Sequence, residues 1–218
     1  MSIQQSLKAS YIPIDRALML TGDLTIPSRV TGTALFADIS GFSSLTERLR
    51  LKYGDAEGAE LLILTLNDVF TALIGALHLH SGSVIGFSGD AITCWFDASY
   101  FDDDAEACAH HAMTTAFAMH DVMRKADWTA VASLDGEANL SMKVALASGT
   151  AKRFVVGDPN IQLNDVLVGD LVMRMAKAEK LASTFETLAD EATVALLGDT
   201  VQLGEWREDH ARRGCKAA

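Results

Sequence analysis

The sequence predicts an α+β fold, with a ferredoxin-like βαββαβ core, additional strands and helices, and its helices on one side of a mainly antiparallel sheet. Three observations support this prediction. A β-rich run at 32–39 is followed by a long helical stretch, and two β-rich runs then flank Ser88-Gly89, a pair suited to a tight hairpin. A second helical stretch leads into another β-rich run at 140–149.

The first long helix is predicted from apolar residues at helical spacing, with Leu62, Leu66, Val69, Leu73 and Leu77 on one face. This stripe indicates a helix over about 55–78 that packs on the sheet. Asn67 and Asp68 interrupt the apolar run, so we expect no membrane insertion.

The remaining elements follow in chain order. Asp102, Asp103 and Asp104 stand before the second helix, where the helix dipole favours negative charge. The segments expected after it are a strand at 140–149, a hairpin partner at 152–158, a strand running into a helix at Gly169, a short strand and helix at 185–198, and an edge strand at 201–206. We divide the chain into an N-terminal arm (1–30), one domain (31–205) and a C-terminal tail (206–218).

Composition limits the partners and the compartment. The chain has 218 residues and a net charge of −11, so it repels nucleic acid and anionic membranes. Its three cysteines form no C-x-x-C pair, and the first residues do not read as a signal peptide, so we expect a cytoplasmic protein. A nucleotide would therefore be bound through metal ions and backbone amides.

Two aspartates are the candidate functional residues. Asp38 ends the first strand and Asp90 sits at the tip of the hairpin, and in a βαββαβ sheet these two elements are neighbours. Carboxylates so close repel unless cations compensate them, and two divalent ions can do so while holding a nucleotide's phosphates. Gly41 lets the chain bend, and amides at the start of the next helix can bind phosphate oxygens.

The stretches ALFADISGFSSLTERL and GSVIGFSGDAITCWF carry a family resemblance. Over about residues 30–200 the chain resembles the class III adenylyl and guanylyl cyclase homology domain, and in particular the soluble adenylyl cyclase branch and the first domain of tandem bacterial cyclases. The resemblance implies a nucleotide site between two domains paired head to tail. There, ATP would become cyclic AMP and pyrophosphate with two Mg²⁺ or Mn²⁺ ions, GTP being left open as the substrate.

The resemblance also assigns roles to residues. Asp38 and Asp90 match the catalytic, metal-binding aspartates, with the backbone of Ile39 as a further metal ligand. The backbone that binds triphosphate corresponds to Ser40, Gly41 and Phe42.

Three positions depart from the family pattern. The base-reading lysine is replaced by Gly86, the ribose-binding asparagine by Met173, and the transition-state arginine by Lys177, which keeps charge without the planar fork. Arg174 could partly cover the same face. We therefore expect the metal-binding half of an adenylate cyclase, weak or inactive alone, that needs a second cyclase domain; a homodimer and a catalytically inactive regulatory domain remain alternatives.

Overall fold

A computed structural model of the chain describes residues 28–125, 128, 134, 139–158, 162–209 and 212–217. The arm expected at 1–30 lies almost wholly outside these residues. The strands are β1 (Arg29–Ser40), β2 (Ser83–Ser88), β3 (Ala91–Asp97), β4 (Ser141–Asp158), β5 (Gln162–Val168), β6 (Thr187–Asp190), β7 (Trp206–Asp209) and β8 (Arg212–Ala217). The helices are α3 (Phe42–Leu79), α4 (Ala105–Lys125), α6 (Asp170–Leu181) and α7 (Glu191–Leu197), with short 3₁₀ turns at Ala98–Phe101 and Gly198–Thr200.

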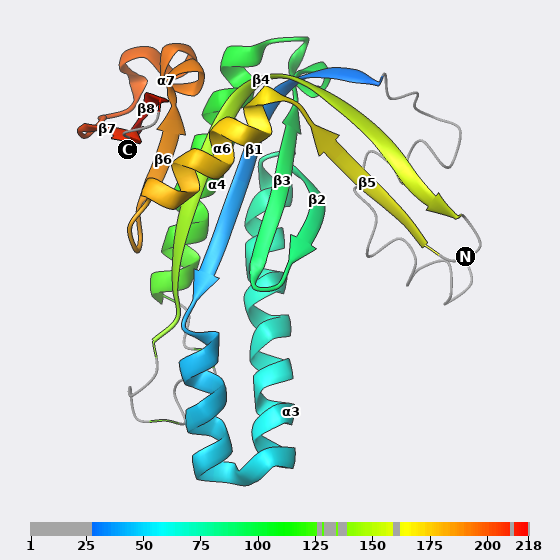
Figure 1. Cartoon of the computed structure of the whole chain (residues 1–218), viewed down its shortest axis with the longest axis vertical. Coiled ribbons are helices and arrows are strands. Elements are labelled where there is room, and N and C mark those ends of the chain that lie inside the picture. The colour runs from blue at the N-terminus through cyan, green and yellow to red at the C-terminus, as the bar shows by residue number, and fades with distance from the viewer. Residues whose placement is uncertain are drawn as a thin grey trace.

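The ferredoxin-like core is confirmed. Strands β2, β3, β1 and β4 are neighbours in that order, every pair is antiparallel, and α3 and α4 make the crossovers. Beyond β4 the sheet continues through β6, β8 and β7, while β5 pairs with β4 alone (Figure 1). The residues of β7 and β8, which the sequence analysis placed in a tail, thus continue the same sheet.

Both faces of the sheet are covered. Alternation along β1 sends Leu35, Ala37 and Ile39 into a core shared with α3 and α4, whereas Ala34 packs on the other face with Leu171 and other apolar residues of α6. Figure 1 shows α6 and α4 on opposite sides of the sheet. The expectation that the helices occupy one side is therefore wrong, because α6 needs its own apolar face buried.

Helix α3 is two helices joined at Gly54, which has φ 82° and ψ 177°. Such a positive φ suits glycine and breaks the helical run. In Figure 1 the two parts form a helical hairpin that extends beyond the sheet. Val69, Leu73 and Leu77 are fully buried, so the predicted packing is confirmed for this part. By length and composition alone, α3 could cross a membrane, and 28% of its most apolar 18-residue stretch is buried.

Strand β4 is longer than expected. Residues 152–158 continue the strand that starts at Ser141 and pair with β5, so they are not the return strand of a hairpin with 140–149. The two strands form an arm at the side of the molecule (Figure 1). At the base of this arm Arg153 Nε donates to Asp165 Oδ2 at 2.8 Å, and both side chains are almost completely buried.

Candidate metal and nucleotide site

Asp38 and Asp90 lie on adjacent elements. Asp38 is near the end of β1, and its Cα partner in β3 is Ala91, the residue directly after Asp90. Asp90 belongs to the two-residue turn between β2 and β3, and its carbonyl oxygen accepts a 3.3 Å hydrogen bond from the Ile39 N–H. The structure thus brings together the two chain segments that the sequence placed in one site. Because Asp90 is in a turn, strand alternation does not fix the direction of its side chain.

The bend after Asp38 depends on glycine. Gly41 has φ 108°, and a Cβ there would lie 2.4 Å from the carbonyl oxygen of Asn139, so any side chain would collide with backbone. Helix α3 begins directly after it, at Phe42, and no side chain caps this end. The first amides of α3 therefore point out of the helix end next to the Asp38 strand, as anion-binding helix ends do. Ser40 is exposed at the end of β1.

Lys143 is a charged neighbour that the sequence analysis missed. It is the Cα partner of Asp38 across β1 and β4, and its Nζ lies 3.3 Å from Asp38 Oδ2. Glu179 of α6 also contacts this lysine, with Oε1 2.6 Å from the same nitrogen. The hydrogen bond with Glu179 raises the pKa of Lys143, burial opposes this rise, and Asp38 adds to it. Only the register of β1 against β4 could have revealed this contact from the sequence.

The donor set suits a hard divalent cation. Two carboxylates and a backbone carbonyl, such as that of Ile39, are oxygen ligands of the kind that Mg²⁺ and Mn²⁺ prefer. In the part of the chain that the structure describes, no three His, Cys, Asp or Glu side chains gather as a metal site. Two aspartates are nevertheless enough where substrate phosphates and water supply the other ligands, which is common for Mg²⁺.

The three positions that depart from the family pattern lie on β2 and α6. A side chain at Gly86 would meet nothing within 4 Å of its Cβ, so the missing lysine leaves open space. Met173 is 63% exposed, and Lys177 is half-buried on the same helix. These positions are open to a partner, and none carries the group that the family uses there.

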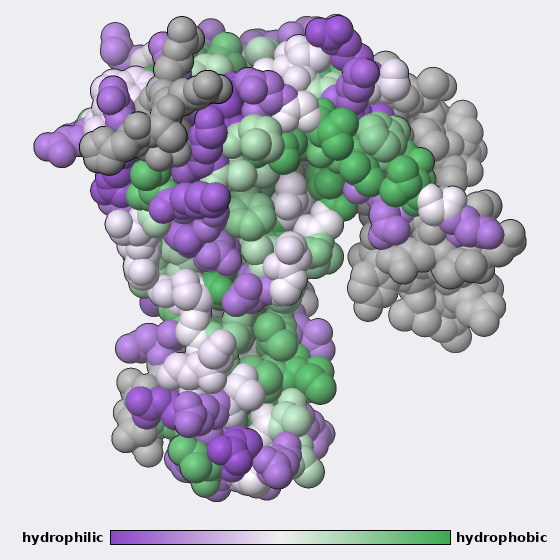
Figure 2. Space-filling model, viewed as in Figure 1, coloured by the Kyte–Doolittle hydropathy of each residue, from purple (hydrophilic) through white to green (hydrophobic). Residues whose placement is uncertain are grey.

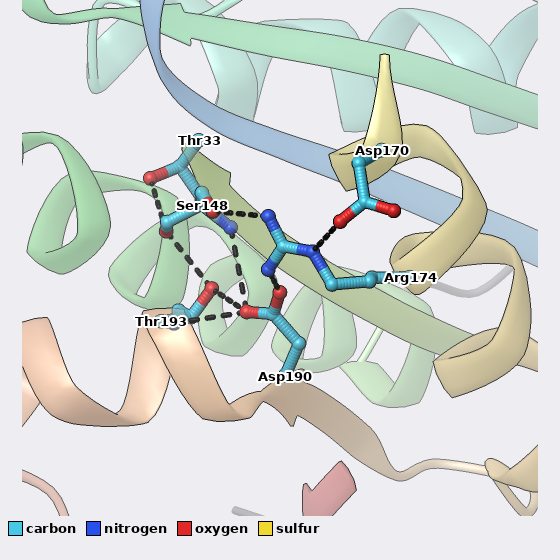
Figure 3. Close-up of polar contacts among 6 residues, drawn as sticks. All are labelled: Thr33, Ser148, Asp170, Arg174, Asp190 and Thr193. Atoms are coloured by element: carbon cyan, nitrogen blue, oxygen red, sulfur yellow. Dashed lines mark hydrogen bonds and ion pairs between the residues drawn. The ribbon is translucent and has the colours of Figure 1, made fainter. Parts of the chain in front are cut away.

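Arg174 is held by its own chain. Its Nε donates to Asp170 at 3.0 Å, its Nη2 donates to the Ser148 carbonyl at 2.9 Å, and its Nη1 pairs with Asp190 Oδ2. Figure 3 shows the guanidinium enclosed by these groups. All three nitrogens are occupied, so Arg174 is a structural residue and does not replace Lys177 at a phosphate.

The network around Arg174 continues into the core. Asp190 Oδ1 accepts hydrogen bonds from the amide and hydroxyl of Thr193, at 2.9 and 2.6 Å, and so caps α7. The Ser148 hydroxyl lies 2.8 Å from those of both Thr33 and Thr193 (Figure 3). These groups are almost fully buried and bind one another, which ties β1, β4, β6, α6 and α7 together.

Comparison with known proteins agrees with this architecture. No family model matches the chain. Adenylate cyclase type 10 of Rattus norvegicus is 34% identical over 89 residues, which are 38% of this chain and 5% of that protein. The Homo sapiens protein of the same name is 22% identical over 151 residues, which are 69% of this chain and 9% of that protein. The chain thus spans less than a tenth of the length of these curated relatives.

Solved structures match over most of the chain. The adenylyl cyclase CyaB from P. aeruginosa superposes with a TM-score of 0.69 at 19% identity, covering 87% of this chain and 92% of that one. The guanylate cyclase domain of RhGC from Catenaria anguillulae, solved with GTP, gives 0.68 at 16% identity, covering 88% and 96%. The resemblance that the two motifs indicated is confirmed: the chain has the fold of the class III adenylyl and guanylyl cyclase catalytic domains.

Proposed function

We propose that this chain is the metal-binding half of a nucleotide cyclase, which converts ATP to cyclic AMP and pyrophosphate together with a complementary cyclase domain. The observation that carries the proposal is the meeting of Asp38 with the Asp90 turn, through the Ile39–Asp90 hydrogen bond, beside the uncapped start of α3. The curated relatives are adenylate cyclases by name, which favours ATP, whereas the solved structures include cyclases of both kinds.

The residues of this chain would divide the work between metal and phosphate. Asp38, Asp90 and the Ile39 carbonyl would hold two Mg²⁺ or Mn²⁺ ions, and the backbone of Ser40, Gly41 and Phe42 would bind the triphosphate. When bound, the ions would neutralise phosphate charge and favour ionisation of the attacking hydroxyl. Lys143, which contacts Asp38, adds a positive charge next to this site.

The partner would cover apolar surface and supply what the chain lacks. The arm formed by β4 and β5 exposes four apolar side chains, each by 37–42%: Phe154, Val155, Val156 and Val168. Figure 2 shows apolar residues gathered on this arm. We propose that a second cyclase domain docks there and brings a lysine, an asparagine and an arginine for the base, ribose and developing charge. We also propose that the chain is cytoplasmic and works without a membrane or nucleic acid.

A cyclase assay tests the proposal. The chain alone, with ATP and Mg²⁺ or Mn²⁺, should form little or no cyclic AMP. Mixed with a complementary cyclase domain it should gain activity, and Asp38→Ala or Asp90→Ala should lower this activity by about 100-fold or more. Failure with every complementary domain, together with no nucleotide binding by calorimetry, would contradict it. Parallel reactions with GTP decide the base preference.

A second candidate is a cyclase-like regulatory domain that binds a partner without catalysis. Gly86, Met173 and Lys177 favour it, since a homodimer would repeat their deficiency at both of its sites. The Asp38→Ala variant separates the two candidates, because a regulatory domain would keep its effect on a partner when the carboxylate is lost.

A further inference from the structure

One lysine connects the proposed metal site to helix α6. The Lys143 ammonium contacts two carboxylates, 2.6 Å from Glu179 and 3.3 Å from Asp38. The three side chains are 22–28% exposed, so water screens these charges only in part. The shorter contact is the one to Glu179, which lies near the end of α6.

This arrangement has a consequence for a metal ion. A divalent cation at Asp38 must share that carboxylate with the Lys143 ammonium, and the two positive charges repel each other. The repulsion grows if the ammonium moves closer to Asp38. Glu179 is the second carboxylate in contact with the ammonium, and without Glu179 the described neighbours leave Asp38 as the only carboxylate in contact with Lys143.

We propose that Glu179 is a positioning residue for the metal site: it binds Lys143 and so keeps Asp38 free to ligate a divalent cation. The inference rests on the proposed function, because it assumes that Asp38 binds metal. Groups outside the ligand shell commonly change metal affinity by about 10–100-fold, and we expect an effect at the lower end of this range.

The sheet geometry fixes the positions of these groups. Asp38 and Lys143 are directly opposite in antiparallel strands, so their side chains leave the same face of the sheet, the face that α6 covers. Ala178, the residue before Glu179, is buried against that face and anchors this end of α6. Glu179 therefore reaches Lys143 from a packed helix, not from a loop.

The test is Mn²⁺ binding to the chain of 218 residues, measured by calorimetry or by the electron spin resonance of free Mn²⁺. Four proteins form a double-mutant cycle: the wild type, Glu179→Gln, Lys143→Gln and the double variant. Glu60→Gln, an exposed charge change on α3, is the matched control.

We expect Glu179→Gln to raise the Mn²⁺ Kd about 10-fold and Lys143→Gln to lower it. In the Lys143→Gln background the effect of Glu179→Gln should largely disappear, because the ammonium that it positions is absent. Glu60→Gln should leave the Kd unchanged. Circular dichroism of each variant confirms that it is folded, and the Lys143→Gln result stands even if Glu179→Gln does not fold.

Three results would overturn the inference. An unchanged Kd in Glu179→Gln shows that Glu179 has no role at the site. An equal loss of affinity in both backgrounds shows that Glu179 acts through its own charge and not through Lys143. No Mn²⁺ binding by the wild type, either alone or with a non-hydrolysable ATP analogue, refutes the proposed metal site itself, and this outcome is distinct from the first two.

Discussion

Two polar pairs across the same strands, β1 and β4, differ in their surroundings. Thr33 faces Ser148 in a fully buried position, with their hydroxyl oxygens 2.8 Å apart. Further along, Asp38 faces Lys143 near the end of β1 and the start of β4, where both side chains are about one-quarter exposed. The first pair has its polar partners within the core, and the second carries charges that solvent and a ligand can reach.

Helix α6 contributes to both places. Arg174 of this helix pairs with Asp190, next to the Thr33–Ser148 pair. Glu179 of the same helix pairs with Lys143, the partner of Asp38. Arg174 and Asp190 bind each other and neighbouring groups of the fold. Asp38 contacts Lys143 through Oδ2, and its carboxylate is partly exposed to a ligand. The network of Asp190 and Arg174 holds the fold, and under the proposed function the partly exposed Asp38 binds metal. Substitutions at the two places should therefore change different measured quantities.

The largest expected effect concerns the residues that α6 and β2 present to a partner. The triple variant Gly86→Lys, Met173→Asn, Lys177→Arg gives the chain the groups that it lacks, and the space beside Gly86 admits the lysine. Each preorganised donor is worth on the order of 100-fold in rate, although the gains need not add. We expect cyclic AMP production by the triple variant alone to rise by about 100-fold or more, measured by chromatography.

The matched control is the triple variant with Asp38→Ala added, which should be inactive. An active wild-type homodimer would contradict the division between a metal half and a partner half. So would activity of the triple variant that survives Asp38→Ala.

The next effect concerns the buried end. Asp190→Ala removes a buried carboxylate that pairs with Arg174 and caps α7, and the loss of the cap and of the charged contact together costs about 3 kcal/mol. The free energy of unfolding in urea should fall by roughly this amount. Asp38→Asn, the control near the end of β1, should change the free energy of unfolding by less than about 1 kcal/mol. Equal losses in the two variants would show that the Asp38–Lys143 pair also stabilises the fold.

A pH-dependent effect, at most of the same size, comes from His120, another buried polar group. Burial, reinforced by the charge of Arg124, lowers its pKa to about 4 from an ordinary 6.5, and its Nε2 lies 3.0 Å from the Thr187 hydroxyl. The folded state holds the neutral ring, so the contribution of His120 to the free energy of unfolding has its full value above pH 6.5. It falls by up to about 3 kcal/mol as pH drops toward 4, because only the unfolded chain gains the proton.

His120→Gln removes this titration and retains a donor toward Thr187. The difference in unfolding free energy between wild type and variant should therefore vary with pH between 6.5 and 4 and be constant above. A difference that is constant over the whole range would show that His120 does not titrate in this way.

The sequence predicted most of the core because local patterns determine it. The β-rich run at 32–39 and the helical stripe from Leu62 to Leu77 identify elements that the structure confirms. Asp104 was expected among the residues that cap α4, and its Oδ1 accepts from the Glu106 amide at 2.8 Å. Both motif aspartates lie on the neighbouring elements that the predicted topology implied.

The predictions failed where contacts between residues distant in the sequence determine the length of a strand or the burial of a side chain. Nothing local shows that β4 runs unbroken to Asp158, since β5 is what stabilises its far half. Nothing in the local sequence shows that Arg153 is buried against Asp165, because Asp165 belongs to another strand. Lys143 was missed because its neighbour Asp38 lies on another strand, and the contact depends on register.

The central claim is that Asp38 and Asp90 together hold metal. The most direct measurement is anomalous diffraction from crystals of the chain grown with Mn²⁺ and a non-hydrolysable ATP analogue. We expect manganese peaks between the two carboxylates, which should lie within about 7 Å of each other, with two ions about 4 Å apart. Carboxylates that point to opposite faces of the sheet, or nucleotide and Mn²⁺ bound away from both aspartates, would contradict it.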